Sequence, residues 1–134
     1  MSRPDTLRAS IRIAATPAEI FPYLVEPRLL VQWIGTWADL NPEPGGVFAL
    51  NVGDTPVRGA FVSVDPPHRV VFTWGVPGSA ALPAGSSTVE ILLTAEGSET
   101  VVELFHHDLP ADELPQHEAG WTSFLDRLRQ VASS

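Results

Sequence analysis

The sequence predicts an α+β fold in which a curved antiparallel sheet wraps around one long C-terminal helix. Three observations predict it. Apolar and polar residues alternate over residues 7–13, as in a half-buried strand. Further strand-like runs between residues 37 and 107 are separated by Gly- and Pro-rich turns. The chain then ends in a segment whose apolar residues recur at steps of three and four, which is typical of an amphipathic helix.

The first strand, expected over residues 7–15, is followed by short helices. Thr16 is a favourable N-cap and Glu19 completes a capping box, so a helix begins there. Pro22 removes a backbone hydrogen bond inside this helix, and we therefore expect the helix to be short or kinked at that residue. A second short helix is expected to begin at Pro27.

Six strand-like runs follow, and their close spacing predicts an antiparallel meander, because parallel neighbours would need long crossovers. The expected strands are 37–40, 47–52, 57–64, 69–75, 87–94 and 99–107. Gly59 lies inside one of them, which indicates a bend or a close backbone approach. The loop 76–85, rich in Gly, Ala, Ser and Pro, could be a lid over one end of a cavity or a simple hairpin extension.

The last element is an amphipathic helix of about four turns, preceded by Pro110 and Pro115. Its apolar face is expected to contain His117, Trp121, Phe124, Leu125, Leu128 and Val131. The predicted order is thus one strand, two short helices, six strands and one long helix that covers the concave face of the sheet.

Composition excludes several classes of protein. With 134 residues, 44% hydrophobic and 18% charged, the chain is expected to form one folded domain over residues 1–134. The net charge is −8 and no basic cluster exists, so we expect no nucleic-acid partner. There is no run of about 18 apolar residues, which predicts no membrane insertion and a cytoplasmic location. The absence of Cys excludes disulfides and thiolate catalysis.

Several short phrases, taken in order, resemble a known family. They are Thr16-Pro17-Ala18-Glu19-Ile20-Phe21, Gln32-Trp33, Gly45-Gly46-Val47-Phe48, Arg58-Gly59-Ala60-Phe61, Pro66-Pro67-His68-Arg69-Val70-Val71-Phe72-Thr73-Trp74, Leu104-Phe105-His106 and His117-Glu118-Ala119-Gly120-Trp121. The sequence resembles the START-like, or helix-grip (SRPBCC), superfamily. Within it, the sequence resembles the bacterial family similar to the C-terminal domain of the activator of the heat-shock protein 90 ATPase. The resemblance covers about residues 7–131.

The resemblance implies a grip-shaped sheet around the C-terminal helix, with an internal cavity that relatives use for lipids, polyketides and other apolar molecules. It implies no single activity. The expected apolar walls are Trp33, Trp37, Phe48, Phe61, Trp74, Trp121 and Leu125. The same aromatic residues could instead fill the core. The small residues Ala49, Gly59 and Ser63 among the inward positions are expected to leave some space.

Two histidines are polar residues on faces that are otherwise apolar. His106 shares a strand face with Val102 and Leu104, and His117 lies one turn before Trp121 on the final helix. If both border the cavity, they could hydrogen-bond a polar group of a largely apolar ligand. Alternatively, each imidazole could attach the helix to the sheet through a hydrogen bond.

Three functions remain open from the sequence. The first is the binding of a small hydrophobic or aromatic molecule, with no cofactor and no metal. The second is an acid–base enzyme that uses His106 or His117, oriented by Asp108 or Glu118, for a proton transfer or a cyclisation. The third is a protein-interaction module similar to a cochaperone. An edge strand could also pair with another copy and form a homodimer.

Overall fold

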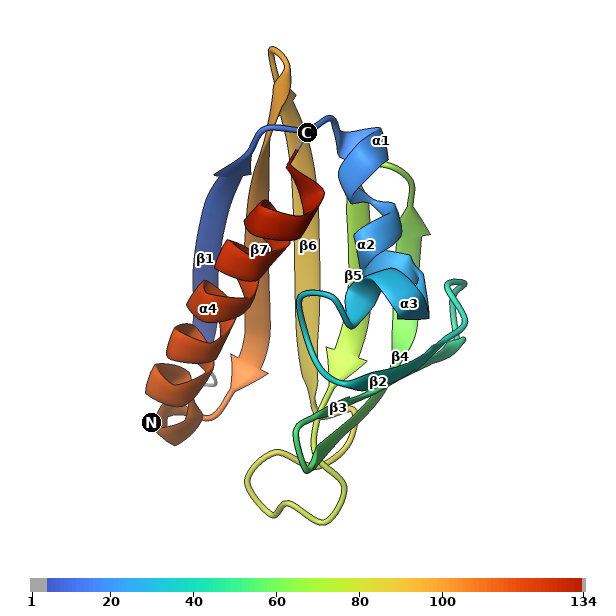
Figure 1. Ribbon diagram of the computed structural model, residues 1–134. Helices are drawn as coiled ribbons and strands as arrows, with labels where there is room; N and C mark the ends of the chain where they lie inside the picture. Colours follow the sequence, from blue (N-terminus) through green and yellow to red (C-terminus); the bar gives the residue numbers. More distant parts are fainter. Residues whose placement is uncertain (1–4, 134) are drawn as a thin grey trace.

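The computed structural model describes residues 5–133, and seven strands of this part form one antiparallel sheet (Figure 1). The strands are β1 (Asp5–Ile13), β2 (Trp37–Leu40), β3 (Val47–Val52), β4 (Thr55–Asp65), β5 (Arg69–Trp74), β6 (Ser87–Glu96) and β7 (Glu99–Leu109). Their order is β1-β7-β6-β5-β4-β3-β2, so β2 to β7 form a meander and β1 pairs with the last strand. The predicted architecture and the predicted antiparallel pairing are confirmed.

The link between β1 and β2 forms three single-turn helices in the described chain, where we expected two. They are α1 (Pro17–Ile20), α2 (Pro22–Val25) and α3 (Pro27–Leu30). The capping box is present: Oγ1 of Thr16 accepts from the backbone N–H of Glu19 at 3.2 Å, and Oε1 of Glu19 accepts from the backbone N–H of Thr16 at 2.9 Å. Pro22 begins α2 instead of kinking a longer helix, because the first turn needs no N–H donor there.

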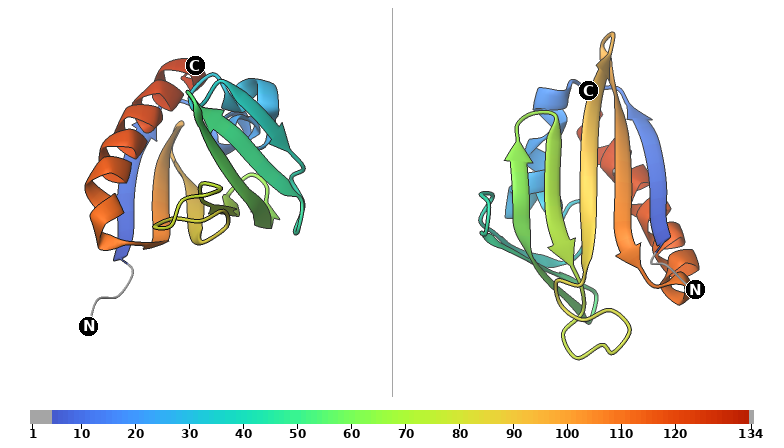
Figure 2. Two further views of the ribbon diagram at one scale, coloured as in Figure 1. Left: turned by 90° about the horizontal axis from the view of Figure 1, so that it is seen from below. Right: turned by 180° about the vertical axis from the view of Figure 1, so that it is seen from behind.

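A 3-10 turn, η1 (Ala111–Glu113), leads into the long helix α4 (Leu114–Ala132), which packs mainly along β1. Helices α1 to α3 and α4 lie against the same face of the sheet, as the view from behind shows (Figure 2). The buried residues of α4 are Trp121, Leu125, Leu128 and Ala132. Val131, which we expected on this face, is 36% exposed, and Ala132 is buried instead. Within residues 5–133, no helix is long and apolar enough to cross a membrane.

Aromatic side chains fill the middle of the concave face. Phe48 stacks on Phe72 with 3.9 Å between ring centres and meets Phe61 edge to face at 5.5 Å. Trp33 is 1% exposed, and its indole N–H donates to the backbone oxygen of Tyr23 at 2.9 Å. These packed rings leave little space over β3, β4 and β5.

Trp37 is not on the concave face, contrary to our expectation. Strand residues alternate between the two faces, and Ala38 and Leu40 pack against the core, so Trp37 points to the outer face. It is 44% exposed there, and the guanidinium of Arg58 lies 5.2 Å from its ring centre.

The small residues expected to leave internal space do not do so. Ala49 follows the inward-facing Phe48 and therefore points to the outer face. Ser63 is also outside, where its hydroxyl donates to Asp65. Gly59 serves a close backbone approach, because a Cβ at this residue would lie 2.0 Å from the backbone oxygen of Thr73. Internal space must therefore arise elsewhere.

Candidate functional site

A pocket lies where α4 begins, and we call it the helix-end pocket. Its volume is about 380 Å³, within the range of about 300–1,000 Å³ that is typical of small-molecule sites. The first half of α4, the loop 76–85, the β3–β4 hairpin and the end of β5 line it. The lining residues are Val52, Thr55, Val57, Trp74, Val76, Ser79, Leu82, Glu113, Gln116, His117, Gly120, Trp121 and Phe124.

The walls of the helix-end pocket are mainly aromatic and aliphatic. The rings of Trp74 and Trp121 are 5.0 Å apart between centres, and Phe124 meets Trp121 edge to face at 6.0 Å. The loop 76–85 folds back on itself, because the backbone N–H of Val76 donates to the backbone oxygen of Leu82 at 2.8 Å. This turn buries Leu82, which is 2% exposed, against the pocket. The loop thus forms one wall.

A chain of hydrogen bonds behind this wall involves His106. The indole N–H of Trp121 can only donate, so Nδ1 of His106 accepts at 3.0 Å. The hydroxyl of Ser87 donates to the backbone oxygen of Trp74 at 2.7 Å, so Nε2 of His106, 2.8 Å from that hydroxyl, carries the proton and donates. The imidazole therefore joins β7, β6 and α4, which is the structural alternative that the sequence left open.

The chain of hydrogen bonds keeps His106 uncharged. Its side chain is fully buried, and burial, with the neighbouring His117 and His107 imidazoles, lowers its pKa from 6.5 to about 3. A proton on Nδ1 would also break the bond from Trp121. His106 therefore does not line the helix-end pocket and has no free nitrogen with which to exchange a proton with a ligand.

His117, in contrast, lines the helix-end pocket. Its Nδ1 lies 2.9 Å from the backbone oxygen of Glu113, one turn earlier, and its ring meets that of His106 edge to face at 5.4 Å. The two imidazoles thus converge, although only one of them borders the pocket. The carboxylate beside His117 belongs to Glu113, with Oε1 3.9 Å from Nδ1, and not to Asp108 or Glu118 as we expected.

Gly120 keeps one side of the pocket open. It lies inside α4, where a glycine destabilises a helix by about 1 kcal/mol relative to alanine. No steric conflict requires glycine here, because a Cβ would find its nearest neighbour, a ring carbon of Phe124, at 3.8 Å. The missing side chain therefore leaves space between His117 and Phe124.

The structure brings together only some of the residues expected to bind a ligand. Trp74, His117 and Trp121 line the helix-end pocket. Trp33, Phe48 and Phe61 are core residues, Trp37 is on the surface, His106 lies behind the wall, and Leu125 faces a different hollow.

Several pocket residues were not predicted as such. Phe124 and Gly120 could have been found, since they follow His117 at the helical spacings of seven and three residues. Leu82 could not, because no local pattern indicates which residue of the loop 76–85 folds back against the sheet.

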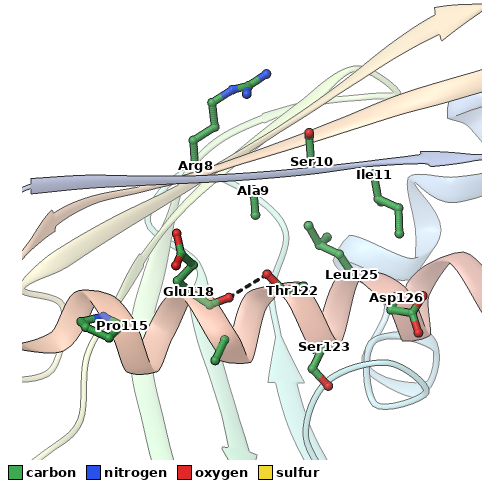
Figure 3. A pocket seen from close by; sticks show the side chains of 11 residues that line it. Arg8, Ala9, Ser10, Ile11, Pro115, Glu118, Thr122, Ser123, Leu125 and Asp126 are labelled. Carbon is green, nitrogen blue, oxygen red and sulfur yellow. Dashed lines mark hydrogen bonds between the residues drawn. The ribbon is translucent and has the colours of Figure 1, made fainter.

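A second hollow, the edge groove, lies between β1 and α4 (Figure 3). Its volume is about 800 Å³. Ala9 and Ile11 point towards α4, whereas Arg8 and Ser10 point away from it, and Leu125 is the large apolar residue of the helix side. The other helix residues in the groove are Pro115, Glu118, Ala119, Thr122, Ser123 and Asp126. Because none of its lining residues is aromatic, the edge groove is the weaker ligand site.

A curved antiparallel sheet that carries a long C-terminal helix, with a small aromatic-walled pocket beside that helix, defines a helix-grip protein. Residues 14–133 match the family model described as "Activator of Hsp90 ATPase homolog 1-like protein". The chain belongs to this family.

Solved structures agree with this assignment. The chain is 40% identical to an AHSA1-like protein from Rhizobium etli, over 97% of this chain and 82% of that one, with a TM-score of 0.76. It is 28% identical to CalU16 from Micromonospora echinospora, over 96% and 76% of the two chains, with a TM-score of 0.78. The Aha1 dimer from Colwellia psychrerythraea is 15% identical over 96% of each chain, with a TM-score of 0.85, and shows the likeness of fold alone. A search of curated proteins finds no match.

Proposed function

We propose that the protein binds a small, largely aromatic molecule in the helix-end pocket, as a cytoplasmic binding protein without a cofactor. The observation that carries the proposal is the wall formed by Trp74, Trp121 and Phe124. The polar atoms behind this wall are bonded to one another, so the wall presents apolar rings to the pocket. Burial of a ligand's rings against such a surface would be stabilised by about 25 cal/mol per Å².

The neighbouring residues Ala119 and Gly120 provide a matched test of this site. A Gly120→Leu side chain projects into the helix-end pocket, whereas an Ala119→Leu side chain projects into the edge groove. We expect wild type to bind the neutral fluorescent probe N-phenyl-1-naphthylamine. We expect G120L to weaken binding by at least about tenfold, which corresponds to ~1.4 kcal/mol, and A119L to leave it nearly unchanged. The measurement is a fluorescence titration, with thermal unfolding as the control for folding.

The opposite result would assign probe binding to the edge groove. If A119L weakens probe binding and G120L does not, the edge groove is the binding site. If wild type does not bind the probe, the proposed function is wrong for this class of ligand.

Acid–base catalysis by His106 is not what we propose, since both ring nitrogens of this residue are bonded inside the core. His117 is the remaining candidate for such a role. A turnover that disappears in a His117→Gln variant while binding persists would favour an enzyme over a binding protein.

A second candidate function is the stimulation of a chaperone ATPase, and exposed apolar residues on three neighbouring strands favour it. Three large apolar residues, Trp37, Val47 and Val62, are 44%, 41% and 51% exposed. They lie on β2, β3 and β4, and the family description names activation of the Hsp90 ATPase. Addition of the purified protein to an Hsp90 ATPase assay tests this candidate: stimulation lost in Trp37→Ala supports it, and no stimulation by wild type contradicts it.

A further inference from the structure

The hydrogen-bond partner of His117 decides which role its second nitrogen can take. A backbone oxygen only accepts, so the bond of 2.9 Å between Nδ1 and the oxygen of Glu113 requires the proton on Nδ1. In the neutral ring the other nitrogen, Nε2, then carries a lone pair and can only accept. The contact with the ring of His106, at an interplanar angle of 87°, holds the imidazole in this orientation.

Nε2 of His117 is open to the helix-end pocket. Among the described residues, no buried side-chain nitrogen or oxygen lacks a hydrogen-bond partner. None of these residues bonds Nε2, so this atom is not sealed in the core. The side chain is 14% exposed and forms part of the pocket lining. Nε2 is thus a fixed acceptor beside the apolar wall.

The charge of the pocket disfavours an anionic ligand. Glu113 is the charged residue of the lining at neutral pH, and its side chain is only 24% exposed. The chain contains no lysine, and no arginine is among the lining residues of the described structure. A ligand carboxylate would therefore lose hydration and meet a like charge without a compensating cation.

Together these contacts select one kind of ligand. We infer that the helix-end pocket takes a neutral aromatic molecule that donates a hydrogen bond, from a hydroxyl or N–H group, to Nε2 of His117. This inference rests on the proposed function and adds the chemical class of the ligand. His117 is then the residue that determines specificity, while Trp74 and Trp121 supply the apolar contact.

A pair of ligands that differ by one methyl group tests the inference. 2-Naphthol donates a hydrogen bond and 2-methoxynaphthalene does not. We expect wild type to bind 2-naphthol about tenfold more tightly, equivalent to ~1.4 kcal/mol, and His117→Phe to bind the two ligands equally. His117→Gln, whose amide oxygen can accept, should restore part of the preference. Dissociation constants are measured by isothermal titration calorimetry at pH 8.

Each outcome separates this inference from the proposed function. Equal binding of both ligands by wild type, or a preference that persists in H117F, overturns the role of His117 and leaves the pocket as the binding site. If wild type binds none of the three molecules, 2-naphthol, 2-methoxynaphthalene and N-phenyl-1-naphthylamine, the proposed function is overturned as well. If wild type binds N-phenyl-1-naphthylamine but neither 2-naphthol nor 2-methoxynaphthalene, the inference alone is overturned. Thermal unfolding shows whether H117F and H117Q remain folded.

A charged ligand tests the second part of the inference, that the ligand is neutral. We expect 2-naphthoate to bind wild type at least about tenfold more weakly than 2-naphthol, and Glu113→Gln to reduce this ratio of the two affinities. Naphthoate binding as tight as naphthol binding in wild type would contradict a neutral donor as the ligand class.

Discussion

At the scale of single residues, the molecule depends on one buried imidazole. His106 accepts a hydrogen bond from Trp121 and donates one to Ser87, and these two bonds connect α4 to the sheet. The bonds also remove the polar end of Trp121 from the pocket wall. The same residue thus stabilises the fold and makes the binding surface apolar.

The lowered pKa of His106 predicts a pH-dependent stability. In the folded state this imidazole stays neutral down to about pH 3, whereas the unfolded chain binds a proton below its ordinary pKa of 6.5. Between these two values the unfolded state holds the extra proton, so the free energy of unfolding falls as the pH falls, by about 1.4 kcal/mol per pH unit. Above pH 6.5 the contribution is complete.

A His106→Gln variant should remove this dependence. At pH 7.5 we expect it to be less stable than wild type by about 1–3 kcal/mol, because the amide lacks the ring contacts that His106 makes with Trp74, His117 and Trp121. The difference should shrink as the pH is lowered from 6.5 to 4.5. Urea unfolding at several pH values measures it, and parallel curves for the two proteins would contradict the buried neutral state of His106.

The alternation of apolar residues was sufficient to predict that His106 points inward. Its two hydrogen-bond partners could not be predicted, because they lie on other elements. Ser87 begins β6, and Trp121, whose indole N–H bonds His106, lies on α4. For the same reason the sequence could not show that His106 lies behind the wall and that His117 lines the pocket. Local patterns determine faces, whereas hydrogen-bond partners depend on tertiary packing.

At the scale of elements, two glycines have opposite roles, and this predicts opposite effects. Gly120→Ala should stabilise the protein by about 0.5–1 kcal/mol, since the helix gains a better residue and the new Cβ has room at 3.8 Å. Gly59→Ala should destabilise it by about 3 kcal/mol or more, because its Cβ would lie 2.0 Å from a backbone oxygen of β5. Chemical denaturation compares both with wild type. Equal effects would contradict these two assignments.

Turn residues allowed the elements to be predicted well, and loops were predicted less well. Proline and capping residues indicated the helical region after β1, although Pro22 begins a new helix there. The loop 76–85 was left as a lid or an extension, and it packs Leu82 into the pocket wall. No short-range periodicity exists in such a segment, so its contacts could not be derived from spacing.

At the scale of the whole molecule, the sheet order followed from strand spacing, but the cavity did not. A cavity is the volume that remains after all side chains pack, and it depends on residues from β3, β5, the loop 76–85 and α4 together. The sequence placed the space between the sheet and the helix without its position along them: Phe48, Phe61 and Phe72 fill one part, and the pocket lies at one end of the helix. The single START-like domain with a core over about 7–131 and the pairing of two copies through an edge strand stay predictions.

The most direct measurement is a set of intermolecular nuclear Overhauser effects between isotope-labelled protein and N-phenyl-1-naphthylamine. The helix-end pocket and the edge groove both contain methyl groups, so the two sites give distinct signals. The account predicts contacts from the probe's aromatic protons to Val57, Val76 and Leu82. Contacts to Ala9, Ile11 and Leu125 in their place would contradict it.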